Sequence, residues 1–143
     1  MHAITRTTRQ TAEPLRAVLR GGVVFLTLTT AAVHASLGGP LFTLNAIGYA
    51  GFAIALVLPG RIAAIHWLVR LGLLGFTAVT IMGWIAFGAR FPLAYVDKGV
   101  EGVLVVFLLI ELWLEDGGPA GVARRGRALV ADTRRAVAAR LGR

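Results

Sequence analysis

Several polar side chains lie within long apolar stretches of this 143-residue chain, where polar chemistry is unusual, and four of them are of particular interest. They are His34, Asn45, Thr80 and Glu101. An imidazole and a carboxylate can exchange a proton, and an amide or a hydroxyl can hydrogen-bond to a ligand. Because an ionisable group costs about 3 kcal/mol to place at the centre of a membrane, we take these residues as candidates for a ligand or proton site.

Other kinds of chemistry find no support in the sequence. The chain has no Cys, which excludes thiolate metal sites, iron–sulfur clusters and cysteine nucleophiles. It has no phosphate-binding glycine loop, no nucleophile elbow and no metal-ligand spacing, and roughly 15 Å of helical rise separates Glu101 from Glu111. We therefore predict no catalytic residue, no metal site and no enzymatic activity.

Two of the histidines raise the question of a bound haem. His34 and His66 fall near opposite ends of helices that should run in the same direction, which argues against a bis-histidine haem. We predict no cofactor, although haem on His34 alone or another pigment stays open as an alternative.

Long apolar segments must position these residues. Hydrophobic residues make up 57% of the chain and charged residues only 15%, a balance far too apolar for a soluble domain of this size. A helix of about 20 residues crosses a ~30 Å hydrocarbon layer, and we predict four such spans, at 17–37, 41–58, 62–88 and 97–114. Tight turns at Gly38-Gly39-Pro40 and Pro59-Gly60 separate the first three spans. The predicted fold is all-α, an integral membrane four-helix antiparallel bundle over residues 11–116.

The start of the fourth span is ambiguous. Either Asp97 caps a short helix, or Pro92 occupies the first turn of a longer one that carries Asp97 and Glu101 inside it. We favour the start at Asp97. Glu101 would then lie about 4 to 6 Å from the outer boundary, at the level of His34, at the ~1.5 Å rise of a helix.

That depth has a consequence for the candidate site. His34, Asn45 and Glu101 should line a polar pocket that faces the outer side, with Thr80 about 12 Å below the boundary. The structural alternative is that these groups only hydrogen-bond across helices, with Glu101 paired to Lys98.

Charge sets the expected orientation. Thirteen of the fifteen Lys and Arg residues fall on one predicted side, and only Arg90 and Lys98 fall on the other. The positive-inside rule therefore predicts a plasma-membrane protein with both termini in the cytoplasm. On the inner side, Arg70 and Glu111 are candidates for an ion pair, unless Arg70 extends to lipid headgroups. A cleavable signal peptide in place of the first span is the weaker alternative.

Two flanks lie outside the predicted bundle. Residues 1–10 should form a flexible cytoplasmic N-terminus, and Thr11 should cap the first helix. Residues 119–143 place apolar side chains on one side and arginines on the rest, which predicts a basic amphipathic helix on an anionic inner leaflet. The lack of aromatic residues between these arginines argues against nucleic-acid binding.

The sequence from Val33-His34 to Tyr49, followed by Asp97-Lys98-Gly-Val-Glu101, resembles small four-helix integral membrane proteins of unknown function from archaea and bacteria. The resemblance covers residues 21–114. It implies a four-span fold and one local arrangement of His34, Asn45 and Glu101, and it implies no activity.

Two functional classes fit these observations. We expect a non-enzymatic membrane protein that acts as an interaction or accessory subunit of a membrane assembly, or as a homo-oligomer, because the chain is small and has packing-prone glycines. The alternative is a transporter or channel-like protein, or a binder of a lipophilic ligand, that uses the outer polar pocket.

Overall fold

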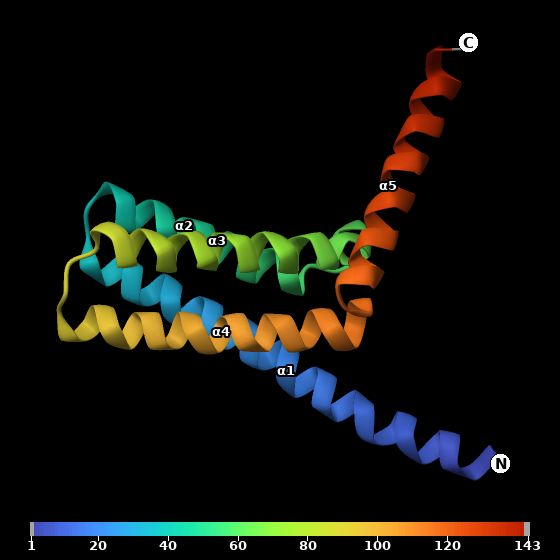
Figure 1. Cartoon of the computed structure of the whole chain (residues 1–143), viewed down its shortest axis with the longest axis horizontal. Helices are drawn as coiled ribbons and strands as arrows, with labels where there is room; N and C mark the ends of the chain where they lie inside the picture. Colours follow the sequence, from blue (N-terminus) through green and yellow to red (C-terminus); the bar gives the residue numbers. More distant parts are fainter. Residues whose placement is uncertain (1, 142–143) are drawn as a thin grey trace. The chain divides into compact units, whose positions relative to one another are not determined.

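The computed structural model describes the backbone of residues 2–141 and the side chains of residues 13–60 and 63–141. Most of this part of the chain is helical and none of it forms a strand, which confirms the all-α prediction (Figure 1). The α-helices are α1 (His2–Leu37), α2 (Pro40–Val57), α3 (His66–Phe87), α4 (Pro92–Asp116) and α5 (Gly118–Leu141), and a 3-10 helix, η1, covers Gly60–Ile65. The chain divides into two compact units, Met1–Glu111 and Leu112–Arg143.

The turns of the first unit form where glycine and proline predict them. Gly38 and Gly39 have φ angles of 68° and 83°, in the left-handed region that glycine enters without steric cost, and Pro40 opens α2. Gly60 has a φ angle of 76° and follows the end of α2. These turns reverse the chain, so α1, α2 and α3 alternate in direction (Figure 1).

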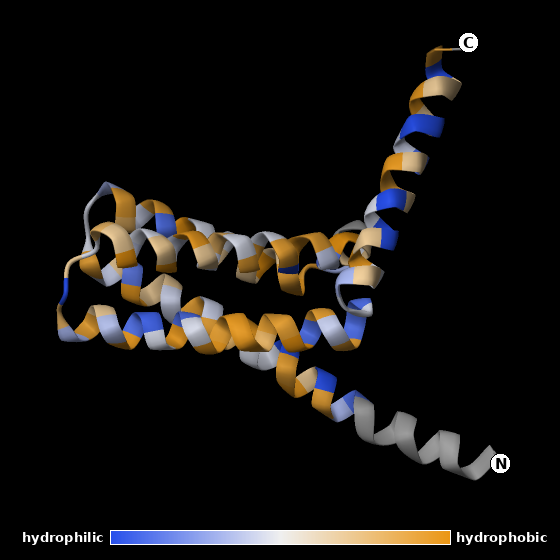
Figure 2. Ribbon diagram, in the orientation of Figure 1, coloured by the Kyte–Doolittle hydropathy of each residue, from blue (hydrophilic) through white to orange (hydrophobic). Residues whose placement is uncertain are grey.

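Three segments are long and apolar enough to cross a membrane: Glu13–Leu37, Pro40–Val57 and Ala63–Phe87. Hydrophobic residues dominate α2 and α3, whereas polar and apolar residues alternate along α4 (Figure 2). The difference arises because α4 carries acidic and basic residues in its first half, where Asp97, Lys98 and Glu101 are found.

Two predicted helix starts are wrong. Helix α4 begins at Pro92 and not at Asp97: the Tyr95 amide donates to the Phe91 carbonyl at 3.3 Å, and proline is well suited to a first turn because it needs no N–H partner. Helix α1 begins at His2 and not after a Thr11 cap. No glycine or proline interrupts the backbone ahead of Pro14, so the helix runs on toward the N-terminus.

Phenylalanines packed over glycines join the helices of the first unit. A Cβ added to Gly22 on α1 would come within 2.6 Å of the Phe107 ring on α4, and one on Gly48 of α2 would come equally near Phe76 of α3. Such pairs of small and large residues let helices approach closely. The fully buried aliphatic residues at the centre are Val23, Leu73, Leu104 and Leu108.

The second unit contains the C-terminal helix that the sequence predicted. Gly117 and Gly118 have positive φ angles of 74° and 66°, which turn the chain into α5. Asp116 is buried, and its Oδ1 lies 2.7 Å from Nη1 of Arg125. One face of α5 is a shallow apolar groove lined by Leu129, Val130, Thr133, Arg134, Val137, Ala138 and Leu141.

Candidate functional site

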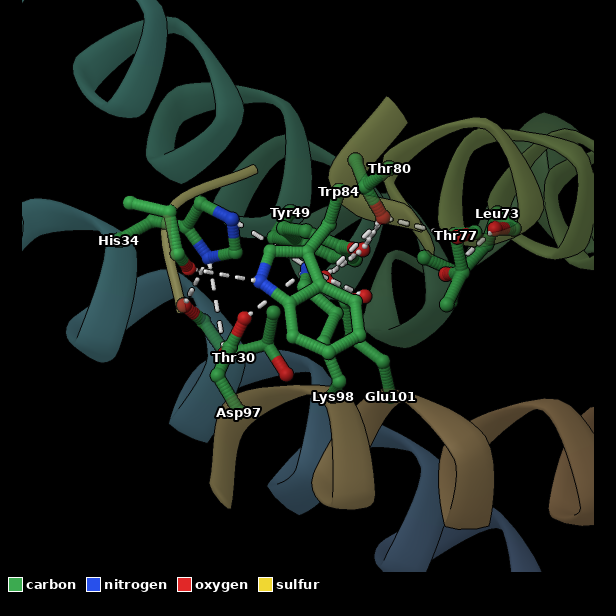
Figure 3. Close-up of polar contacts among 11 residues, drawn as sticks. Thr30, His34, Tyr49, Leu73, Thr77, Thr80, Trp84, Asp97, Lys98 and Glu101 are labelled. Carbon is green, nitrogen blue, oxygen red and sulfur yellow. Dashed lines mark hydrogen bonds and ion pairs between the residues drawn. The ribbon is translucent and has the colours of Figure 1, made fainter. Parts of the chain in front are cut away.

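Six polar side chains from four helices meet inside the first unit (Figure 3). We call this group the polar cluster; its members are His34 of α1, Tyr49 of α2, Thr80 of α3, and Asp97, Lys98 and Glu101 of α4. Glu101 and Tyr49 are 0% exposed, and His34 and Asp97 are 2% exposed. A buried group with this many ionisable members is costly unless its charges are paired, so the pairing decides what the cluster can do.

Glu101 is the best-connected member of the cluster. Its Oε2 lies 2.6 Å from the Lys98 ammonium. The Tyr49 hydroxyl donates to its Oε1 at 2.9 Å, and the Thr80 hydroxyl lies 3.1 Å from the same oxygen and 2.9 Å from the Tyr49 hydroxyl. Phe76 packs edge-on against the Tyr49 ring, with the centroids 4.9 Å apart, and holds it in place. These contacts stabilise a carboxylate at a fixed position.

Asp97 is less fully paired. Lys98 lies 3.1 Å from its Oδ2. Its Oδ1 lies 3.7 Å from Nδ1 of His34 and, among the described residues, accepts no hydrogen bond. The Lys98 ammonium therefore contacts one oxygen of Asp97 and one of Glu101, and the other oxygen of each carboxylate faces the histidine.

The geometry of His34 determines which ring nitrogen carries the proton. Its Nδ1 lies 3.0 Å from the Thr30 carbonyl oxygen, which can only accept, so Nδ1 donates. In a neutral ring Nε2 is then the acceptor, and Nε2 lies 4.0 Å from Oε1 of Glu101. The ring is held between Phe42 and Tyr49, with centroid distances of 5.9 and 5.6 Å.

The charges of the polar cluster do not cancel. Asp97 and Glu101 contribute two negative charges and Lys98 one positive charge, so the cluster has a net charge of −1 while His34 is neutral. An uncompensated charge is expensive in a low-dielectric interior. A proton on His34 or another cation would restore neutrality.

A cavity of about 410 Å³ adjoins the cluster. His34, Asn45, Thr80, Asp97 and Lys98 form its polar end. Its other walls are mainly apolar and aromatic and include Leu37, Leu41, Phe42, Val79, Trp84, Phe87, Phe91 and Ala94. The Trp84 indole donates to the Ala89 carbonyl at 3.1 Å, and the Arg90 guanidinium lies 4.0 Å from its ring centroid, so this wall is fixed.

The fold brings the predicted residues together, although not at the predicted depth. His34, Thr80 and Glu101 belong to the polar cluster, and Asn45 lines the cavity. Glu101 is the ninth residue after Pro92, about 13 Å along the helix, and Thr80 lies about 10 Å before the end of α3. The prediction that Glu101 lies much nearer the boundary than Thr80 is therefore wrong, because it assumed the later helix start.

Three members of the cluster were missed by sequence reasoning. Tyr49 follows Asn45 by one helical turn, so the face shared with Asn45 was a signal for it. Asp97 was taken as a helix cap and Lys98 only as a surface partner of Glu101. The sequence spacing also predicted no metal site, yet His34, Asp97 and Glu101 each offer a potential ligand atom, and these atoms all lie within 4.8 Å of one another.

The inner ion-pair candidates occupy the other end of the bundle. Arg70 and Glu111 are each 3% exposed. Glu111 Oε1 lies 4.0 Å from Nε of Arg20 on α1, a partner that was not predicted. The pair between Arg70 and Glu111 stays a prediction.

Comparison with known proteins does not identify the function of the site. No protein-family model matches the chain, and no curated protein or solved structure is significantly similar to it. The resemblance to small four-helix membrane proteins therefore stays a prediction, and the function has to be inferred from the cluster and its cavity.

Proposed function

We propose that this chain is a multi-pass membrane protein that binds a lipophilic molecule with a polar head group in the cavity beside the polar cluster. The observation that carries the proposal is the junction of a mainly apolar cavity with a buried, negatively charged set of side chains. A volume of about 410 Å³ lies in the range of ligand pockets, roughly 300 to 1,000 Å³.

The distribution of residues on α4 supports four membrane spans. Its charged residues in the first half point inward, with Asp97 and Glu101 at most 2% exposed. Its exposed side chains there carry no charge and include Leu93 at 40%, Val96 at 60% and Val103 at 47%. A helix in water would show the opposite pattern, because hydration stabilises exposed charged side chains and burial stabilises valine side chains. We therefore assign α4 as a fourth span beside the three apolar helices.

Charge supports one orientation of the bundle. The ends of the helices near Arg20 and Arg70 would face the cytoplasm of a plasma membrane, and the polar cluster would lie in the outer half of the bilayer. The arginines and apolar face of α5 suit an anionic inner leaflet.

The cavity favours a particular kind of ligand. His34 and Asp97 line its polar end, and Oδ1 of Asp97 accepts no hydrogen bond from the described residues, so a head group that donates hydrogen bonds or carries a positive charge would satisfy this oxygen. Leu37, Leu41 and Phe42 offer a wall for a hydrocarbon tail. An amphiphile with a hydroxyl or amino head and an apolar body is the class of ligand we propose.

A role in a membrane assembly is the second candidate function. A Cβ added at Gly99 or Gly102 on α4 would meet nothing within 4 Å, and exposed Val103 and Val106 continue along the same helix. A face of this kind would allow close approach of another helix, from an accessory partner or a second copy. The pocket has the stronger support, because buried ionisable groups are costly for a purely structural role.

Native mass spectrometry of the protein extracted in mild detergent tests the pocket. We expect the wild type to retain a small-molecule adduct and Gly83→Leu to lose it, since Gly83 lines the cavity and has open space for a larger side chain. Gly75→Leu is the matched control, because Gly75 lies on the same helix, also has open space and does not line the cavity. An adduct that survives Gly83→Leu unchanged would contradict the proposal, as would no adduct after addition of lipid extract from the native membrane.

A further inference from the structure

We infer that His34, Asp97 and Glu101 bind a divalent transition-metal ion of the zinc class at the polar end of the cavity. One potential ligand atom from each residue lies within 4.8 Å of the others, and all three side chains are at most 2% exposed. The inference goes beyond the proposed function: a metal ion and a polar head group would compete for Oδ1 of Asp97, so each is tested by a readout of its own.

The state of His34 suits a metal ligand. A metal-ligating histidine typically donates its other ring N–H to a carbonyl or a carboxylate, which fixes the ring and its tautomer. Nδ1 of His34 donates to the Thr30 carbonyl at 3.0 Å and lies 3.7 Å from Asp97. Nε2 therefore presents a lone pair toward the Glu101 carboxylate at 4.0 Å. Two acceptors facing each other in a buried site call for a positive species between them.

The carboxylates divide their oxygens in the way that such a site needs. Lys98 holds Oδ2 of Asp97 and Oε2 of Glu101, at 3.1 and 2.6 Å. Oδ1 of Asp97 is buried and accepts no hydrogen bond from the described residues. On the other carboxylate, the hydroxyls of Tyr49 and Thr80 orient Oε1. The net charge of −1 is present without the ion, so a cation is favoured electrostatically.

The ligand set selects the class of metal. One imidazole nitrogen and two carboxylate oxygens are a set of three that zinc accepts, with a fourth position left open. Magnesium and calcium require about six or more oxygens and are poorly served by it. Zinc ligands lie about 2.0 to 2.2 Å from the ion, hence ~3.4 Å from each other, so the three atoms, now within 4.8 Å of one another, would have to approach by up to about 1.4 Å. His34 and Asp97 both line the cavity, which leaves the open position accessible from it.

Metal titration of the intact chain tests the site. The protein is purified in mild detergent, stripped with a chelator, and titrated with Zn²⁺, with Co²⁺ and with Mg²⁺. We expect one Zn²⁺ per chain, a visible Co²⁺ spectrum of tetrahedral type, and no saturable binding of Mg²⁺. His34→Asn and Asp97→Asn should each weaken Zn²⁺ binding by at least about tenfold. Tyr49→Phe, which removes only a supporting hydroxyl, should weaken it by about tenfold.

A second histidine provides the matched control. His66 is buried and its Nε2 lies 3.2 Å from the Leu58 carbonyl oxygen, but it starts α3 at the other end of the bundle. His66→Asn should leave Zn²⁺ affinity unchanged. A variant counts as folded when it gives a monodisperse helical preparation. If His34→Asn does not fold, Tyr49→Phe still tests the metal site, because it keeps every proposed ligand.

Two results would overturn the inference. The first is Zn²⁺ binding that is absent, or that is equal in the wild type, His34→Asn and Asp97→Asn. The second is a His34 ring that takes up a proton, seen by NMR, while no metal binds, since the positive species would then be that proton. Failure of the lipophile proposal is separable: Gly83→Leu should abolish the adduct and keep Zn²⁺, whereas Asp97→Asn should lose Zn²⁺.

Discussion

The two ends of the four-helix bundle both bury ionisable groups, but their charges differ in sign. At the polar cluster, Asp97 and Glu101 outnumber Lys98, and a cavity adjoins them. At the other end Arg70 and Arg20 outnumber Glu111, and Arg20 is 45% exposed in its side chain. Arg20, the partner of buried Glu111, reaches the surface and can interact with water or lipid phosphate, whereas Lys98, the partner of buried Glu101, is only 12% exposed in its side chain. We infer that the end with Arg20 and Glu111 has a structural role and that the end with the polar cluster binds a cation.

The largest expected effect separates the two ends by their side of the membrane. The chain has no Cys, so a single introduced thiol is an unambiguous reporter. Ser36→Cys, in the last turn of α1, should react with a membrane-impermeant thiol reagent in intact cells. Ala64→Cys, in η1, should react only after permeabilisation. The positive-inside rule gives this all-or-none difference, and the reverse labelling pattern would refute the proposed orientation.

The next effect compares the stability that each buried carboxylate provides. Glu101→Gln should lower the free energy of unfolding by about 3 kcal/mol or more, because it removes the closer charged partner of the Lys98 ammonium and the charged acceptor of the Tyr49 hydroxyl. Glu111→Gln should cost less, since exposed Arg20 can be solvated. Denaturant titration in detergent with a chelator present measures both, and equal losses would remove the distinction between the two ends.

Sequence reasoning predicted much of the framework on which this comparison depends. The Gly38-Gly39-Pro40 and Pro59-Gly60 turns were predictable because positive φ angles and a missing N–H are local properties of residues. The start of α4 was not, because Pro92 and Asp97 are both good start signals and only the packing of the helix decides between them.

The candidate site was predictable only in part, for a related reason. His34 and Glu101 stand out in an apolar sequence, and their polarity alone marks them. Asp97 was not predicted as a site residue, since an aspartate can either cap a helix or face inward as a metal ligand. Its position beside His34 depends on the register of α4 against α1. That register involves contacts between helices, such as that of Phe107 with Gly22, and no local sequence pattern encodes it.

Removal of Lys98 should change the stability of the metal-free protein and its Zn²⁺ affinity in opposite directions. Lys98→Met takes away the only positive charge of the cluster, so Asp97 and Glu101 would repel each other in the metal-free protein. We expect lower stability without metal and Zn²⁺ affinity raised by about tenfold. Calorimetric titration checks the affinity. Weaker binding in Lys98→Met would mean that the ammonium organises the site and does not compete with the ion.

The smallest expected effect distinguishes two threonines on α3. Both hydroxyls lie 2.8 Å from a carbonyl oxygen of their own helix, that of Leu73 for Thr77 and that of Thr77 for Thr80, but the Thr80 hydroxyl also contacts Glu101 and Tyr49 on other helices. Valine keeps the shape of threonine. Thr80→Val should therefore cost about 0.6 kcal/mol of stability, the typical value of a hydrogen bond between membrane helices, and Thr77→Val should cost less. Because Thr80 also orients Oε1 of Glu101, its loss should weaken Zn²⁺ binding as well, while Thr77→Val leaves it unchanged. Equal behaviour of the two variants would place Thr80 among the framework residues and confine the site to the charged members of the cluster and Tyr49.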